Sequence, residues 1–140
     1  MTTQNARTNP RIRAYGRNVG MSFQIIDDLL DFTGDESTLG KSILSDLGEG
    51  RVTLPLIHAL NGNGGLNYDR IAGLLRRKDI SEEEKRGLLE ALAANGALAY
   101  TRAKAGEFSE RSLDCLKHFP EGESRNALTG LASFVLARKR

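Results

Sequence analysis

The chain has 140 residues and a net charge of +2, which is long enough for one domain with a buried core. The modest charge shows no basic concentration and argues against nucleic-acid binding. A single cysteine, Cys115, rules out an internal disulfide and favours the cytoplasm. No apolar run approaches the ~20 residues of a transmembrane helix. We therefore expect a cytoplasmic protein that is not transmembrane.

Helical periodicity recurs along the chain, whereas strand signals are nearly absent. The patterns predict helices over residues 10–33, 52–60, 68–78, 82–95 and 97–118, and from about residue 124 to the end. Ser81 and Glu84 have the spacing of a capping box at the start of one helix. We predict a single all-α domain over residues 1–140, a helical bundle, with residues 1–9 disordered.

The last predicted helix is amphipathic. Its apolar residues recur at spacings of three and four, which is typical of a face packed against a core. We expect four side chains to point inward: Leu128, Leu131, Val135 and Leu136.

Three carboxylates and an amide lie within two turns of the first helix, at Gln24, Asp27, Asp28 and Asp31. At 100° per residue these side chains fall within a sector of about 100°. Like charges so close would repel, and partial burial would discharge them. Mg²⁺ carrying phosphate oxygens would remove the conflict, because Mg²⁺ is typically held by one or two carboxylates plus substrate phosphates.

The remaining circumference of this helix is largely apolar. One stripe comprises Ile12, Tyr15, Val19, Phe23, Ile26 and Leu30. A helix that is apolar over most of its surface is usually buried among other helices. The acidic sector, extended by Gly16 and Gly20, should then face a cavity; the alternative is an ordinary solvated acidic face.

The segment 34–51 is polar, bears glycines and is too long for a simple turn, which favours a functional loop. Lys41 and Arg51 could bring positive charge to phosphate oxygens, and Asp46 and Thr53 belong to the same cluster. In the alternative interpretation, Lys41 and Arg51 form surface pairs that contribute little. Their partners would then be Asp35, Glu36, Asp46 and Glu49.

Two stretches resemble a known family. Residues 15–35, which contain Gln24-Ile-Ile-Asp-Asp-Leu-Leu-Asp31, are similar to the second aspartate-rich region of the trans-isoprenyl diphosphate synthases, the polyprenyl synthetase family. Residues 39–55 resemble the segment that follows this region in the family. The resemblance implies the C-terminal half of an all-α isoprenoid synthase fold. It also implies isoprenoid biosynthesis, in which an Mg²⁺-dependent prenyltransferase condenses an allylic diphosphate with isopentenyl diphosphate.

The same resemblance implies a role for each matching residue. Asp27 would be the principal Mg²⁺ ligand, and Asp28 and Asp31 would be outer ligands. Gln24 would hydrogen-bond near the metal, and Lys41 would hold the allylic diphosphate, which makes these two the candidate catalytic residues. A separate position, Arg51, stands where the family commonly has a lysine and would bind diphosphate.

The family's first aspartate-rich motif has no counterpart in residues 1–14, which contain no aspartate. We therefore expect the chain alone to be inactive. The apolar faces around Phe23 and Ile26 should be exposed and imply partners, either further copies of the chain or a helical subunit. The alternative is a non-catalytic helical module that packs against a full-length synthase.

Overall fold

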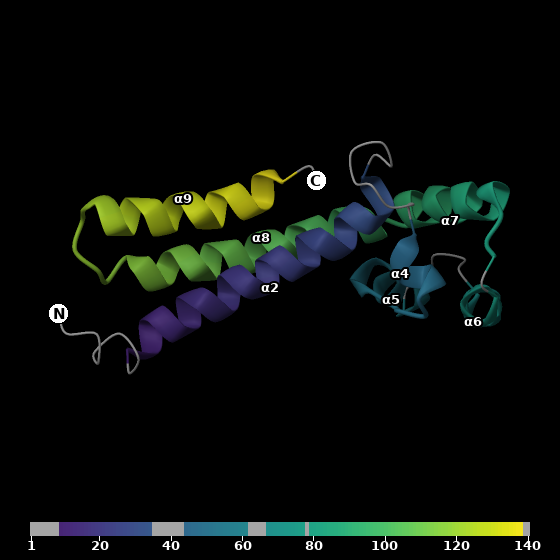
Figure 1. Ribbon diagram of the computed structural model, residues 1–140, viewed down its shortest axis with the longest axis horizontal. Helices are drawn as coiled ribbons and strands as arrows, with labels where there is room; N and C mark the ends of the chain where they lie inside the picture. Colours follow the sequence, from purple (N-terminus) through teal and green to yellow (C-terminus); the bar gives the residue numbers. More distant parts are fainter. Residues whose placement is uncertain (1–8, 35–43, 62–66, 78, 139–140) are drawn as a thin grey trace. The chain divides into compact units, whose positions relative to one another are not determined.

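A computed structural model describes residues 9–34, 44–61, 67–77 and 79–138. Within these ranges the chain forms α-helices and no strand, which confirms the all-α class. The helices are α2 (Pro10–Thr33), α4 (Ser45–Gly48), α5 (Leu54–Asn61), α6 (Tyr68–Arg76), α7 (Glu82–Ala94), α8 (Ala97–Leu116) and α9 (Glu123–Ala137) (Figure 1). No helix in these ranges has the length and apolar character needed to cross a membrane.

The chain divides into two compact units. The long-helix unit contains α2 up to Ile26 together with Ala103–Arg138, and so includes most of α8 and all of α9. The short-helix unit contains Asp27–Arg102, with the end of α2, the helices α4 to α7 and the beginning of α8. Residues 1–8 lie outside the described ranges, so the predicted disorder of residues 1–9 stays a prediction. The predicted single domain also stays a prediction.

In the long-helix unit, α2, α8 and α9 lie side by side (Figure 1). Small hydroxyl side chains pin the helices together at buried positions. Ser22 Oγ on α2 donates to the Ala105 carbonyl of α8 at 3.0 Å, and Ser109 Oγ on α8 donates to the Ala132 carbonyl of α9 at 3.2 Å. Small residues let helix backbones approach closely, and each buried hydroxyl has an acceptor, so these contacts avoid the cost of burying an unpaired polar group.

A third link joins the first and last helices of this unit. The Tyr15 hydroxyl donates to the Leu128 carbonyl at 2.7 Å, and the Tyr15 side chain is 5% exposed. This burial raises the pKa of the Tyr15 phenol above its ordinary value. The phenol therefore stays a neutral donor at physiological pH.

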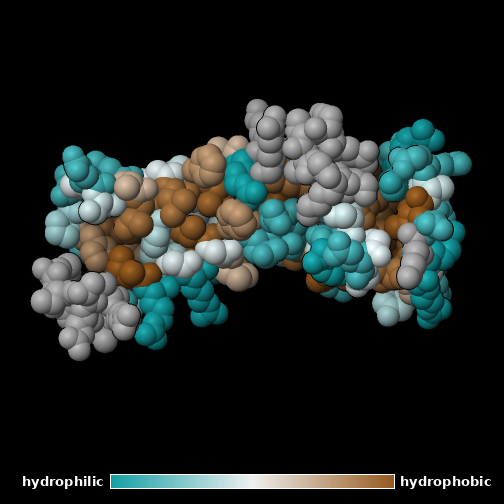
Figure 2. All heavy atoms as spheres, in the orientation of Figure 1, coloured by the Kyte–Doolittle hydropathy of each residue, from teal (hydrophilic) through white to brown (hydrophobic). Residues whose placement is uncertain are grey.

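One prediction for α9 is wrong. Val135 is buried and Leu128 and Leu136 are partly buried, but Leu131 is 47% exposed. The residue that faces α8 most closely is Ala132, whose side chain is 1% exposed and whose carbonyl accepts the Ser109 hydrogen bond. Close approach at alanine turns the adjacent leucine outward. Apolar surface is visible over the helices of this unit in Figure 2.

The short-helix unit has its own hydrophobic core. Its buried members come from every helix of the unit: Phe32, Leu44, Leu47, Leu56, Ala59, Ile71, Leu74, Leu88, Leu92 and Ala97. Since α4 to α6 are short, their stability depends on packing into this core more than on helix propensity. The core therefore holds the end of α2 against the segment that follows it.

The predicted capping box is confirmed at the start of α7. The Ser81 hydroxyl accepts from the Glu84 backbone N–H, and the Glu84 carboxylate accepts from the Ser81 N–H at 3.0 Å. Arg77 also donates to Glu84. This Arg77 hydrogen bond, followed by that from the Ser81 backbone, holds the pKa of the Glu84 carboxyl below its usual range. Both bonds favour the charged form of Glu84, so the box is formed by a carboxylate.

Candidate functional site

The acidic motif begins on an exposed face of α2. Gly16, Gly20, Gln24 and Asp27 are exposed, and Asp28 is partly buried. A methyl group built at either glycine would meet nothing within 4 Å among the described residues. This face therefore combines carboxylates with a smooth stretch that a ligand could approach closely.

The apolar stripe of α2 is partly different from the prediction. Phe23 is 43% exposed, as expected, but Ile26 is completely buried, so the expected exposure around Ile26 is wrong. Ile26 lies across the helix from Gln24 and beside the buried Leu29 and Leu30, and it belongs to the packed face. The exposed apolar side chains beside the polar sector are Phe23 and Met21.

Asp31, the last carboxylate of the motif, points into the protein and is only 7% exposed. Its Oδ1 accepts from Ser45 Oγ at 2.7 Å, and its Oδ2 accepts from the Asp46 backbone N–H at 3.2 Å. The Asp31 carbonyl also accepts from the Leu44 N–H at 2.9 Å. Asp31 thus supplies acceptors to backbone N–H groups at the start of α4, which have none within the helix itself.

The residue before α4 has an unusual backbone conformation. Leu44 has φ 65° and ψ 28°, in the left-handed region, and its side chain is 2% exposed. This conformation costs a residue with a Cβ roughly 1–2 kcal/mol. Core packing of Leu44 and the hydrogen bond to Asp31 offset that cost. Leu44 is thereby held against the end of α2.

Arg51 is linked to Asp31 through Asp46, whose backbone N–H donates to the Asp31 carboxylate. Its guanidinium pairs with Asp46 Oδ1 at 2.7 Å and with the Glu49 carboxylate, while the Arg51 side chain remains 57% exposed. Two of the pairings in the alternative interpretation of the loop are therefore present. An exposed arginine in such surface pairs can still turn to a phosphate, because the pairs contribute little free energy.

Two other predicted site residues have different outcomes. Lys41 lies outside the described residues. The Thr53 Oγ1 atom is buried and has no hydrogen-bond partner among the described residues. Sequence reasoning had not singled out Ser45 or Leu44; the only available signal was a serine followed by Asp46, a common helix start.

The donor set fits a metal that arrives with its substrate. No group of three or more His, Cys, Asp or Glu side chains converges within the described part of the chain. The motif instead offers the carboxylates of Asp27 and Asp28 from a single helix. Mg²⁺ is commonly bound through one or two carboxylates, waters and substrate phosphates rather than by an all-protein cage.

Comparison with known proteins identifies the family. The model of the polyprenyl synthetase family matches residues 1–92 of the 140. The chain is 38% identical over 133 residues to the octaprenyl diphosphate synthase of Escherichia coli K12, which covers 92% of this chain and 40% of that protein. It is also 32% identical over 125 residues to heptaprenyl diphosphate synthase component 2 of Bacillus subtilis 168, covering 89% and 35% respectively. The chain belongs to the polyprenyl synthetase family.

Solved structures agree with this assignment. A crystal structure of a polyprenyl synthase from Caulobacter crescentus CB15, complexed with calcium and isoprenyl diphosphate, superimposes with a TM-score of 0.82 and 34% sequence identity. The match covers 93% of this chain and 40% of that one. The resemblance inferred from residues 15–35 and 39–55 is therefore confirmed, and so is the all-α isoprenoid synthase fold. The chain spans 35–40% of the length of the two curated relatives above.

Proposed function

We propose that this chain is the C-terminal part of a trans-polyprenyl diphosphate synthase and supplies the second aspartate-rich half of its active site. The observation that carries the proposal is the exposed face of α2, where Asp27 and Asp28 follow Gly16 and Gly20 along the same helix. A solvated acidic face would not need glycines two and three turns upstream. A wall that receives a diphosphate and its attached hydrocarbon chain would need both features.

In this proposal Asp27 is the principal Mg²⁺ ligand and Asp28 acts beyond it, through water. Bound Mg²⁺ would neutralise charge on the diphosphate leaving group of the allylic substrate. Gln24 would hydrogen-bond at the rim of the site, while Lys41 and Arg51 would bind diphosphate oxygens. Asp31 would act on the metal site indirectly, because both of its carboxylate oxygens accept hydrogen bonds from the start of α4.

The proposed reaction joins an allylic diphosphate to isopentenyl diphosphate. The sequence holds one Asp-Asp-x-x-Asp motif, at Asp27 to Asp31. We therefore propose that the 140-residue chain does not elongate prenyl diphosphates alone and works with a second helical segment or subunit, or as an oligomer. The name of the Bacillus subtilis relative, component 2, supports such an arrangement. We place the protein in the cytoplasm, in keeping with its single cysteine.

Calorimetric titration of the chain with inorganic diphosphate tests the proposed site. With Mg²⁺ present we expect binding that Asp27→Ala weakens at least about tenfold, because one charge-assisted metal contact is lost. Asp79→Ala is the matched control, since Asp79 is an exposed aspartate outside the motif. Equal binding by both variants would contradict the carboxylate assignment and favour a non-catalytic helical module that packs against a complete synthase.

A further inference from the structure

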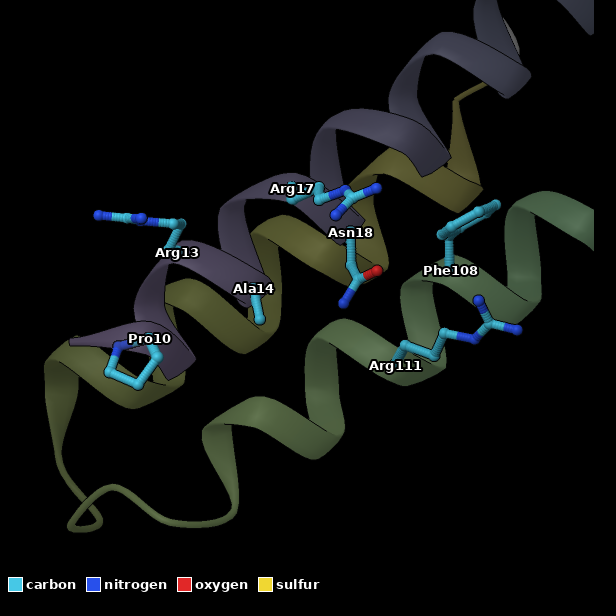
Figure 3. A pocket seen from close by; sticks show the side chains of 7 residues that line it. All are labelled: Pro10, Arg13, Ala14, Arg17, Asn18, Phe108 and Arg111. Atoms are coloured by element: carbon cyan, nitrogen blue, oxygen red, sulfur yellow. The ribbon is translucent and has the colours of Figure 1, made fainter. Parts of the chain in front are cut away.

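The long-helix unit contains a second candidate site, on α2 upstream of the aspartates. An open cavity of about 520 Å³ lies between α2 and α8, within the size range of small-ligand sites. It is lined by Pro10, Arg13, Ala14, Arg17, Asn18, Phe108 and Arg111 (Figure 3). The lining therefore carries three arginines and no acidic side chain.

Polar side chains from both helices border this cavity. Figure 3 shows Arg17 and Asn18 extending from α2 toward α8, whereas Arg13 extends away from the space between the helices. On α8, the Arg111 guanidinium carbon lies 5.1 Å from the centre of the Phe108 ring. This cation–π contact keeps Arg111 along the helix surface at the cavity wall. Arg17 and Asn18 thus border the cavity from α2, and Arg111 borders it from α8.

The Glu107 carboxylate lies near Arg111, on the same helix. Glu107 lies 3.8 Å from Arg111 Nη2, at the long end of an ion pair. Lys104 Nζ is much closer to Glu107, at 3.0 Å and 2.8 Å from its two oxygens. This lysine is the main reason why the pKa of the Glu107 carboxyl is below its ordinary value. Glu107 is therefore shared between Lys104 and Arg111, and its shorter contacts are with Lys104.

We propose that this cavity binds the diphosphate group of a small molecule without a metal ion. The guanidinium forks of Arg17 and Arg111 match phosphate oxygens in pairs, and they approach from two different helices. The amide of Asn18 adds a neutral donor from α2. The Phe108 ring gives the cavity an aromatic wall, against which an attached hydrocarbon group would pack.

The diphosphate can be the free ion or the head of a prenyl diphosphate, and two probes separate these sources. Inorganic diphosphate and geranyl diphosphate are each titrated into the full chain by calorimetry, in EDTA and at constant ionic strength. EDTA removes the divalent ions on which the proposed site at Asp27 depends. If the cavity takes a prenyl diphosphate, Phe108→Ala weakens the binding of geranyl diphosphate alone; if it takes the free ion, Phe108→Ala changes neither affinity.

The double variant R17A/R111A should weaken binding of inorganic diphosphate at least about tenfold, since two charge-assisted contacts are removed. R76A/R86A is the matched control, because it removes equal charge from exposed positions of the short-helix unit. Circular dichroism checks folding, and R17Q/R111Q replaces the alanine variant if that protein unfolds.

Several results would overturn the assignment. They are a parent chain that binds no diphosphate in EDTA, equal weakening by the two double variants, and binding of polyanions such as heparin but not of diphosphate. Asp27→Ala should leave binding in EDTA unchanged. The proposal for the cavity and the proposal for the Mg²⁺ site can therefore be contradicted independently.

Discussion

The carboxylate of Asp31 and the hydroxyl of Ser45 form a 2.7 Å hydrogen bond that fastens the end of α2 to the start of α4. The same carboxylate accepts from the Asp46 N–H, and Asp46 in turn pairs with Arg51. Asp31 is therefore connected to Arg51, a predicted diphosphate-binding residue, through one hydrogen bond and one ion pair. Besides its proposed part in metal binding, Asp31 therefore supports the start of α4.

Asp31→Asn should destabilise the chain by about 1–3 kcal/mol, because a buried charge-assisted acceptor is lost and an amide group faces a backbone donor. Ser45→Ala should cost about 1.5–3 kcal/mol, the usual range for a hydrogen bond to a charged group. Urea unfolding measures both values. Asp27→Ala, at an exposed position, should change stability by less than about 0.5 kcal/mol.

The stability of these variants separates support of α4 by Asp31 from direct binding of Mg²⁺ by Asp31. If Asp31→Asn unfolds at the same urea concentration as the parent chain yet loses Mg²⁺-dependent diphosphate binding, Asp31 is a direct ligand and its support of α4 is unimportant.

The sequence was sufficient to predict what depends on a single helix. Pro10 and the spacing of the apolar residues correctly predicted α2 as Pro10–Thr33, and the sector arithmetic placed Gln24 and Asp27 on one side of it, where the structure shows both exposed. The role of Asp31 could not be predicted, because Ser45 is fourteen residues away and its position depends on how Leu44 packs. Helical periodicity carries no information on contacts of that kind.

The orientation of α9 was missed for a related reason. Periodicity allowed either Leu131 or Ala132 near the centre of the buried face, and hydrophobicity favoured leucine. The contact with α8 instead favours the smaller residue, because Ser109 reaches the Ala132 carbonyl only where the helices approach closely. Helix-to-helix distance is set by both partners and is not encoded in α9 alone.

This orientation makes a testable contrast between adjacent residues. Ala132→Leu should destabilise the chain by about 1–3 kcal/mol, because extra methylene groups must enter a packed interface. Leu131→Ala should cost less than about 1 kcal/mol, since nearly half of the Leu131 side chain is already exposed. Thermal unfolding followed by circular dichroism compares the two variants. A larger loss for Leu131→Ala would mean that α9 packs with the face originally predicted.

The buried Tyr15 hydroxyl should make stability fall at alkaline pH. Burial raises the pKa of Tyr15 in the folded chain above its unfolded value near 10. The folded state then binds the phenolic proton more tightly than the unfolded state does. This contribution is fully present below about pH 10 and is lost as the pH rises from there through the folded pKa.

Tyr15→Phe removes both the titrating group and its hydrogen bond to Leu128. At pH 7 the loss of that bond should cost about 0.5–1.5 kcal/mol. Urea unfolding between pH 8 and 11 should then show a shallower alkaline decline in Tyr15→Phe than in the parent chain. Tyr68→Phe is the control, because Tyr68 is 72% exposed and its removal should leave the pH profile unchanged. If the two phenylalanine variants have the same alkaline profile, burial of Tyr15 does not control this pH dependence.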